Sequence, residues 1–273
     1  SKESFGIYSE QMTAKNTGEI NIIENSTKSI GLYATKKNTV NTELINEGKI
    51  NIETKNDANI GLLTDNAKVI NATAGEVNVL KGENIGALIS GTGEGENLGK
   101  ISSIADGSIG ILTKDSGKFT NSGKIIINAK ASSTNKGAIG ILANTGSNFT
   151  NPTGKLDINV SGRNSVGIYS KGTVKVGVGS ISAADNAINF FADTNGNIEF
   201  ESGKVVNSTT KSGALLFYDG NSNGKIKLVG DLKATIEGGN SATERGSALF
   251  YRSSSAPVNG SVTGYNNAIS YGS

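Results

Sequence analysis

Residues 29–63 read SIGLYATKKNTVNTELINEGKINIETKNDANIGLL, and the motif that opens this stretch, Ser29-Ile30-Gly31-Leu32-Tyr33, closes it again as Asn59-Ile60-Gly61-Leu62-Leu63. Copies with the same glycine lie on both sides, at Gly6, Gly86, Gly110, Gly140 and Gly167. Successive glycines are separated by 25, 30, 25, 24, 30 and 27 residues. Weaker copies without the glycine follow at residues 187–191, 214–217, 247–250 and 268–271. A recurring interval of this length is typical of a protein in which each repeat is one structural unit.

A second motif lies between these copies and consists of a glycine turn followed by alternating apolar residues. Its clearest examples are Asn16-Thr17-Gly18-Glu19-Ile20-Asn21-Ile22 and Asn46-Glu47-Gly48-Lys49-Ile50-Asn51-Ile52. Further copies begin at Gly75, Gly99, Gly123, Gly154, Gly196 and Gly224. A fainter third element precedes the turn, as in Val69-Ile70-Asn71, Phe119-Thr120-Asn121 and Phe149-Thr150-Asn151. The period-2 alternation indicates strands, and no window has the 3.6-residue apolar period of a helix.

Three short strands per repeat of about 26 residues predict an all-β fold, a right-handed parallel β-helix of about 10–11 coils. Equivalent residues of successive coils then stack into columns about 4.8 Å apart. We expect the last position of the first motif to form an interior or corner ladder, and the motif glycine to mark a bend or a close backbone approach. That ladder would contain Tyr8, Tyr33, Leu63, Leu88, Leu112, Leu142, Tyr169, Phe191, Phe217, Phe250 and Tyr271.

The composition excludes several classes of chemistry. The chain has no His and no Cys, so Ser-His-Asp and Cys-His catalysis, His-based zinc sites and disulfides are absent, and we expect no metal and no cofactor. Lys+Arg 26 against Asp+Glu 24 leaves a net charge of +2, which gives no reason to expect nucleic acid as a partner. No apolar run approaches the roughly 20 residues of a membrane-spanning helix.

The Gly-Ile-Tyr and Gly-Ile-Leu strands that alternate with Asn-x-Gly-Lys-Ile-x-Ile strands resemble the passenger domains of large fusobacterial autotransporter adhesins. The resemblance covers nearly the whole chain and is strongest over residues 1–170. It implies type V secretion, a position on the bacterial cell surface at the outer membrane, and binding of a host-cell receptor or another bacterium. It also implies that contact with the membrane runs only through a translocator barrel, and we expect this chain to be a segment of a longer passenger.

We expect one β-helical unit over residues 1–273, with regular coils over residues 1–180 and more degenerate, aromatic-richer coils over residues 181–273. Three repeat intervals are long, from Gly31 to Gly61, from Gly110 to Gly140 and from Leu215 to Ala248. Insertions in solenoids map to loops, and loops carry recognition. The last interval contains an inserted loop near residues 238–246, so the predicted binding residues are Glu244, Arg245, Tyr251 and Arg252.

Other interpretations stay open. Some β-helices are polysaccharide lyases or hydrolases that use carboxylates, and the candidate acids here are Asp185 and Asp193, or Glu199 and Glu201. We do not expect an enzyme, because no Asp-x-Asp or Asp-Asp pair occurs in the chain. A lysine column at Lys100, Lys124 and Lys155 would attract acidic glycans, but the same column mixes signs elsewhere, which favours a solvated face. A purely passive spacer is a third possibility.

Overall fold

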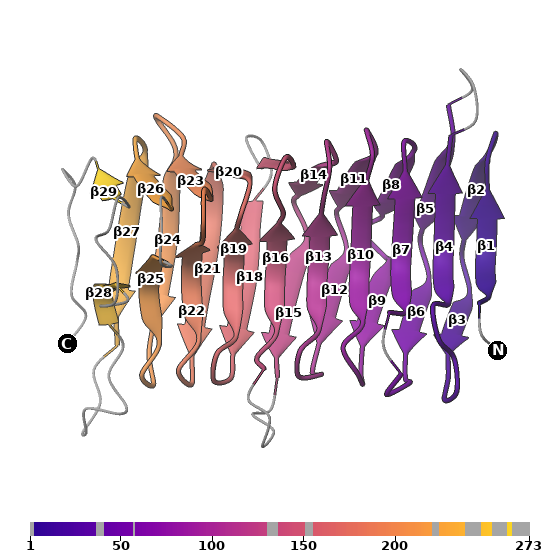
Figure 1. Cartoon of the computed structure of the whole chain (residues 1–273), viewed down its shortest axis with the longest axis horizontal. Coiled ribbons are helices and arrows are strands. Elements are labelled where there is room, and N and C mark those ends of the chain that lie inside the picture. The colour runs from indigo at the N-terminus through magenta and orange to yellow at the C-terminus, as the bar shows by residue number, and fades with distance from the viewer. Residues whose placement is uncertain are drawn as a thin grey trace.

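The computed structural model describes residues 3–36, 41–56, 58–129, 136–150, 155–219, 224–237, 247–252 and 261–263. In these residues the chain is entirely β-structure and turns, and its strands form three parallel sheets that run along one elongated rod (Figure 1). Within the described part no helix is long and apolar enough to cross a membrane. The predicted fold class, a parallel β-helix with three strands per coil, is confirmed.

Each sheet collects one strand from every coil. Sheet A contains β1 (Phe5–Ser9), β4 (Ile30–Thr35), β7 (Ile60–Asp65), β10 (Ile85–Ser90), β13 (Ile109–Thr113), β16 (Ile139–Ala143), β19 (Val166–Ser170), β22 (Ile188–Ala192), β25 (Leu215–Asp219) and β28 (Ser247–Arg252). Sheet B contains β2 (Thr13–Asn16), β5 (Glu43–Asn46), β8 (Lys68–Asn71), β11 (Glu94–Asn97), β14 (Lys118–Asn121), β17 (Asn148–Thr150), β20 (Thr173–Val176), β23 (Asn197–Phe200), β26 (Lys225–Leu228) and β29 (Ser261–Thr263). Sheet C contains β3 (Glu19–Ile22), β6 (Lys49–Ile52), β9 (Glu76–Val79), β12 (Lys100–Ser103), β15 (Lys124–Asn128), β18 (Lys155–Ser161), β21 (Val178–Ala184), β24 (Val205–Thr210) and β27 (Asp231–Ile236).

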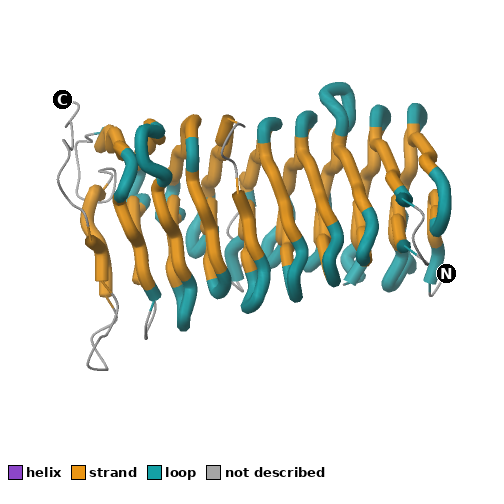
Figure 2. The backbone as a smooth tube through the Cα atoms, turned by 90° about the horizontal axis from the view of Figure 1, so that it is seen from above, coloured by secondary structure: helices purple, strands orange, loops and turns teal. Residues whose placement is uncertain are grey.

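Every described pairing between coils is parallel, and most pairings keep like residues in register; the β25–β28 pairing has a register shift between Leu215 and Phe217. In sheet A, for example, Ile30 pairs with Ile60 and Leu32 with Leu62. Figure 2 shows the successive coils side by side along the rod, joined by turns at its corners. Most inward side chains of the three sheets form one continuous core that runs from Leu32 to Ala234, and Ile22, Ile52, Val79 and Ala105 form a smaller second cluster. A single coil has too little apolar surface to fold alone, so this core exists only because the coils stack.

The strands of sheet A from β4 to β16 depart from regular alternation at the motif glycine. In β4, Gly31 and Leu32 are both buried, whereas Ile30 and Tyr33 are half-buried on the outer side. A regular strand sends successive side chains to opposite faces, so two consecutive inward residues mark a bulge-like interruption. The outward positions Ile30 and Tyr33 are therefore three positions apart in the sequence, with two inward residues between them, whereas successive outward positions of a regular strand are two apart.

The glycine of the first motif is required because the backbones of stacked coils approach closely. A Cβ atom on Gly31 would lie 2.6 Å from the carbonyl oxygen of Gly61 in the next coil and 2.9 Å from Cγ2 of Ile50 in sheet C. Gly61, Gly86, Gly110 and Gly140 would meet the next carbonyl at 2.5–2.6 Å. The predicted close approach is confirmed.

The coils that lack the glycine compensate for it in sheet C. Asn189 occupies the glycine position, is fully buried, and donates from Nδ2 to the hydroxyl of Ser208 at 2.8 Å. Ser208 pairs in register with Ile181, which packs near Gly167 in the preceding coil. One coil further on, the same two columns hold Leu216 and Ala234. The larger residue in one sheet is thus matched by a smaller residue in the other, as close packing of the interior demands.

A buried ladder of asparagines fixes the corner between sheets B and C. Asn16, Asn46, Asn71, Asn97 and Asn121 end successive strands of sheet B, and each amide Nδ2 donates to the Oδ1 of the next at 2.7–2.8 Å. Buried amides need such partners, because an unpaired polar group in the interior is costly. The asparagine-rich corners are therefore structural ladders, which was the favoured interpretation of their sequence.

Two predicted column assignments are wrong. The ladder from Tyr8 to Phe191 lies on the outer face of sheet A, not in the interior, because the two inward residues at the glycine reverse the parity of the strand. In backbone register, this column continues from Phe191 to Tyr218 and Tyr251, whereas Phe217 pairs with Phe190 and Phe250; Tyr271 lies outside the described residues.

The lysine column is also broken. Lys155 pairs with Val178, and the residue in register with Lys124 is Asp157. The strands after Gly196 and Gly224 belong to sheet B and not to sheet C. Phe119 and Phe149 do stack in the core as expected, with ring centroids 6.2 Å apart.

Candidate interaction surface on sheet A

The outer faces of sheets B and C are those of a solvated rod. Their outward columns alternate in charge from coil to coil, as in Glu19, Lys49, Glu76 and Lys100 on sheet C. Ion pairs link neighbouring coils, with Lys68 Nζ 3.3 Å from Glu43 Oε2 and Lys227 Nζ 3.3 Å from Glu199 Oε2. Exposed pairs of this kind stabilise a protein by about 0–1 kcal/mol each. These two faces need no partner.

The outer face of sheet A is apolar along the rod. It carries two parallel ridges of aliphatic and aromatic side chains, which we call ridge 1 and ridge 2. Ridge 1 consists of Phe5, Ile30, Ile60, Ile85, Ile109, Ile139, Val166, Ile188 and Leu215. Ridge 2 consists of Tyr8, Tyr33, Leu63, Leu88, Leu112, Leu142, Tyr169 and Phe191. From β1 to β22, the only charged residue in the strands of this sheet is Asp65, at the end of β7.

A trough runs between the ridges because the two residues that separate them point inward. Three residues at about 3.3 Å each place the ridges about 10 Å apart, against about 6.6 Å in a regular strand. Around β19 and β22 the trough contains a hollow of about 540 Å³ that is lined by both ridges. Its walls are Val166 and Ile188 on one side and Tyr169 and Phe191 on the other. The centroids of the Tyr169 and Phe191 rings lie 4.5 Å apart.

A polar cluster stands beside this hollow. The Tyr169 hydroxyl donates to Oδ2 of Asp193, and Lys171 Nζ lies 3.6 Å from the same oxygen and 5.7 Å from the centre of the Tyr169 ring. Partial burial and the hydrogen bond to Asp193 raise the pKa of Tyr169 above its ordinary value. Burial favours a higher pKa for Asp193 too, but the Tyr169 and Thr194 hydrogen bonds and the Lys171 charge outweigh it and lower that pKa. The cluster is a self-satisfied ion pair that orients Tyr169.

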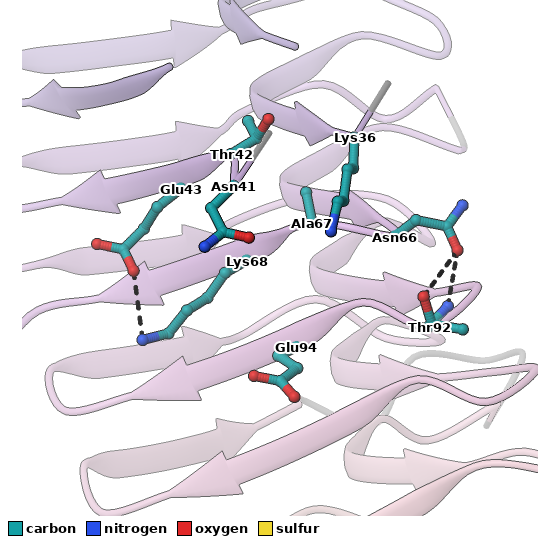
Figure 3. Close-up of a pocket in the computed structure, with 9 residues that line it drawn as sticks. All are labelled: Lys36, Asn41, Thr42, Glu43, Asn66, Ala67, Lys68, Thr92 and Glu94. Carbon is teal, nitrogen blue, oxygen red and sulfur yellow. Dashed lines mark hydrogen bonds and ion pairs between the residues drawn. The ribbon is translucent and has the colours of Figure 1, made fainter. Parts of the chain in front are cut away.

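A second hollow, of about 360 Å³, lies at the corner between sheets A and B (Figure 3). Lys36, Glu43, Lys68 and Glu94 line it, and Figure 3 shows Glu43 and Lys68 joined by their ion pair. Ala67 is the only apolar side chain in its lining. The two lysines and two glutamates of the lining balance each other, and Glu43 and Lys68 are already paired across coils. The hollow therefore has little net charge with which to attract a ligand.

Of the two candidate acid pairs of the enzyme interpretation, one is widely separated in the structure, whereas Glu199 in β23 and Glu201 just after it lie only two residues apart and are both half-buried. Asp185 and Asp193 lie in the turns at opposite ends of β22, which at about 3.3 Å per residue separates them by roughly 16 Å or more. Paired carboxylates of glycosidases lie about 5–9.5 Å apart. Glu199 is paired with Lys227, and Asp193 with Tyr169 and Lys171. Within the described residues, no group of three or more acidic side chains is arranged to hold a metal ion.

The binding residues predicted from the inserted loop fall largely beyond the structural description. Glu244 and Arg245 lie outside the described residues, as does the rest of segment 238–246. Tyr251 and Arg252 end β28, where their backbones pair with Tyr218 and Asp219. Sequence reasoning found the residues of ridge 2 but placed them in the interior. The signal that would have corrected this is the glycine, which is the first of two consecutive inward positions between the outward ones.

Comparisons with known proteins identify no relative. No family model, no curated protein and no solved structure matches this chain.

Proposed function

We propose that this chain is a non-catalytic segment of a bacterial surface adhesin of the autotransporter type. It is a stiff rod that projects binding loops towards host cells or other bacteria. The observation that carries the proposal is the division of the rod into two solvated faces and one apolar face. An extended apolar face suits contact with another macromolecule, whereas an enzyme needs a groove with convergent polar groups.

Rigidity follows from the way the coils are joined. Successive coils are held together by parallel pairings in the three sheets and by the core, and from Asn16 to Asn121 also by the asparagine ladder. The sequence resemblance supports the placement on the bacterial surface, after type V secretion. In this proposal Glu244, Arg245, Tyr251 and Arg252 are the contact residues for the receptor, which is a protein or glycan of a host cell or of a partner bacterium.

The test is a binding assay with the fluorescently labelled chain on epithelial cells and on bacteria of other species. We expect saturable binding that unlabelled protein displaces. The double variant Arg245→Ala/Arg252→Ala is expected to weaken this binding at least about 10-fold, since buried interface arginines are often worth more than about 1 kcal/mol each. The matched control is Arg163→Ala, which removes the only other arginine of the chain, an exposed residue in a turn.

Two results would overturn the proposal. The absence of saturable binding to every cell type would reduce the chain to a spacer. Release of new chain ends from acidic polysaccharides incubated with the protein would favour the enzyme interpretation instead.

A further inference from the structure

From the two ridges and the trough between them, we infer that sheet A is a docking face for a second copy of this chain, with the two rods packed face to face and pointing in the same direction. The inference rests on the proposed function only in taking the rod to stand on a cell surface, where neighbouring copies are aligned. The docking itself follows from the shape, chemistry and size of the face.

The shape of the face is self-complementary. The trough is about 10 Å wide, three residues at about 3.3 Å, so it holds one row of Leu, Ile or Tyr side chains. Each copy offers both a ridge and a trough, and both repeat at the same interval of about 4.8 Å along the rod. Ridge 2 of one copy therefore fits into the trough of the other over the whole length of the face. Two packed sheets normally lie about 10 Å apart with interdigitating side chains, and this arrangement reproduces that geometry.

The chemistry of the face favours an equally apolar partner. From β1 to β22 the strands of sheet A contain one charged residue, Asp65, and it lies at the strand end, two residues beyond Leu63 of ridge 2. The charged side chains of a polar partner would lose their bound water on this face without gaining an opposite charge to pair with. The tyrosine hydroxyl of Tyr169 is already bound to Asp193, so it does not demand a polar partner either. A second copy meets these conditions without any further component.

The size of the face is sufficient for a dimer of modest affinity. Nine ridge positions at about 4.8 Å, and a breadth of about 15 Å including the side chains, give about 600 Å² per copy and about 1,200 Å² in total. This lies at the lower end of the range for specific interfaces. We therefore expect association at micromolar concentrations, which neighbouring copies on one cell surface exceed.

Symmetry decides the relative direction of the rods. A closed pair of identical chains is related by a two-fold axis. If that axis ran along the strands of sheet A, each ridge would face its own copy and the ridges would collide. If it runs along the rod, the second copy is free to shift across the face until its ridge enters the trough. Only a two-fold axis along the rod lets the ridges of the two copies interlock, and it leaves both N-terminal ends at the same end of the pair.

The test is sedimentation of the whole chain over a wide concentration range, with two matched double variants. Leu88→Lys/Leu112→Lys places two cations on ridge 2 in adjacent coils, where the side chains are half-buried and face outward. Ile45→Lys/Ile70→Lys makes the equivalent change on the outer face of sheet B. Both outward positions tolerate lysine without disturbing the core, which far-UV circular dichroism checks.

We expect a monomer–dimer equilibrium for the unmodified chain and for the sheet B variant. The dissociation constant of the sheet A variant should rise at least about 100-fold, since charges are strongly disfavoured at the centre of an apolar interface. A monomeric unmodified chain at every concentration, or equal weakening by both variants, would overturn the inference. A monomer that still binds cells refutes the docking alone, and a dimer that binds no cell refutes the adhesin alone.

The direction is tested on the dimer by pulsed electron spin resonance with a spin label on Gln11→Cys, since the chain has no other cysteine. Gln11 is exposed in the turn after β1. Parallel rods keep the two labels at the same height along the rod. Antiparallel rods would separate them by about eight coils, or about 40 Å along the rod at 4.8 Å per coil, and that result would overturn the assigned direction.

Discussion

The exchange of Gly and Ile for Asn and Ser between neighbouring coils predicts that a matched pair of substitutions costs less stability than the sum of the two single substitutions. The cycle consists of Gly167→Asn, Ile181→Ser and the double variant, which copies Asn189 and Ser208 into the preceding coil. At Gly167, even a Cβ atom would lie 2.7 Å from Cδ1 of Ile181 and 2.9 Å from the carbonyl oxygen of Asn189. Ile181 is 1% exposed, so both sites belong to the dry core.

The magnitudes follow from these contacts. Gly167→Asn alone overpacks the core, at about 1–3 kcal/mol, and buries an unpaired amide, at about 1–3 kcal/mol, for a total of about 4 kcal/mol. Ile181→Ser alone removes most of a buried side chain and buries a hydroxyl, which costs about 4 kcal/mol. In the double variant the serine makes room for the amide and accepts its hydrogen bond, as Ser208 does for Asn189 at 2.8 Å. We expect a loss of about 5 kcal/mol in place of about 8, a coupling of about 3 kcal/mol.

The assay is urea-induced unfolding followed by far-UV circular dichroism, with the free energy of unfolding compared across the four proteins. The control is Gly18→Asn, since a Cβ atom at Gly18 meets nothing within 4 Å, and its effect should stay within about 0.5 kcal/mol. A coupling below about 0.5 kcal/mol would refute the reasoning, because the two positions would then act independently.

Two further predictions concern the asparagine ladder and the Asp193 cluster. Asn71→Ala should lower the free energy of unfolding by about 3 kcal/mol, because it removes hydrogen bonds to Asn46, Asn97 and the carbonyl of Lys100. The control Asn78→Ala, on the outer face of sheet C, should lower it by less than about 1 kcal/mol. Equal losses for the two variants in urea titrations would contradict the role of burial. The folded state lowers the pKa of Asp193 below its ordinary value of 3.8, so ionised Asp193 stabilises the fold above that pH, and this stabilisation is lost as the pH falls through the folded pKa. The difference in unfolding free energy between the unmodified chain and Asp193→Asn should therefore shrink on acidification from pH 6 to about pH 3. A constant difference would count against the cluster.

The sequence was sufficient for the fold because stacking in a solenoid repeats the same local environment in every coil. The glycine of the first motif, the Asn-x-Gly turn and the alternation of residues such as Ile50 and Ile52 each report a position within the coil. In-register columns then follow from the interval alone. The phenylalanine stack of Phe119 and Phe149 and the asparagine ladder were predictable for the same reason.

The face on which a column lies was not predictable from the interval. Ridge 2 was expected in the interior because it is apolar in every copy, but an apolar column is also what a docking face contains. Its orientation depends on Gly31 and Leu32 both turning inward, and that depends on Gly61 and Ile50, which come from another coil and another sheet. The degenerate copies near Phe217 and Phe250 were misaligned by one residue, since only pairing with Phe190 fixes their register.

By itself, the sequence determined that this chain is a parallel β-helix of three-stranded coils without His or Cys chemistry, because each coil carries its own turn and strand signals. Only the tertiary structure decided that one face is apolar and grooved, that the missing glycines are balanced by small residues in sheet C, and that Asp185 and Asp193 lie apart. These properties depend on atoms from different coils and sheets meeting in space, and no single repeat contains that information.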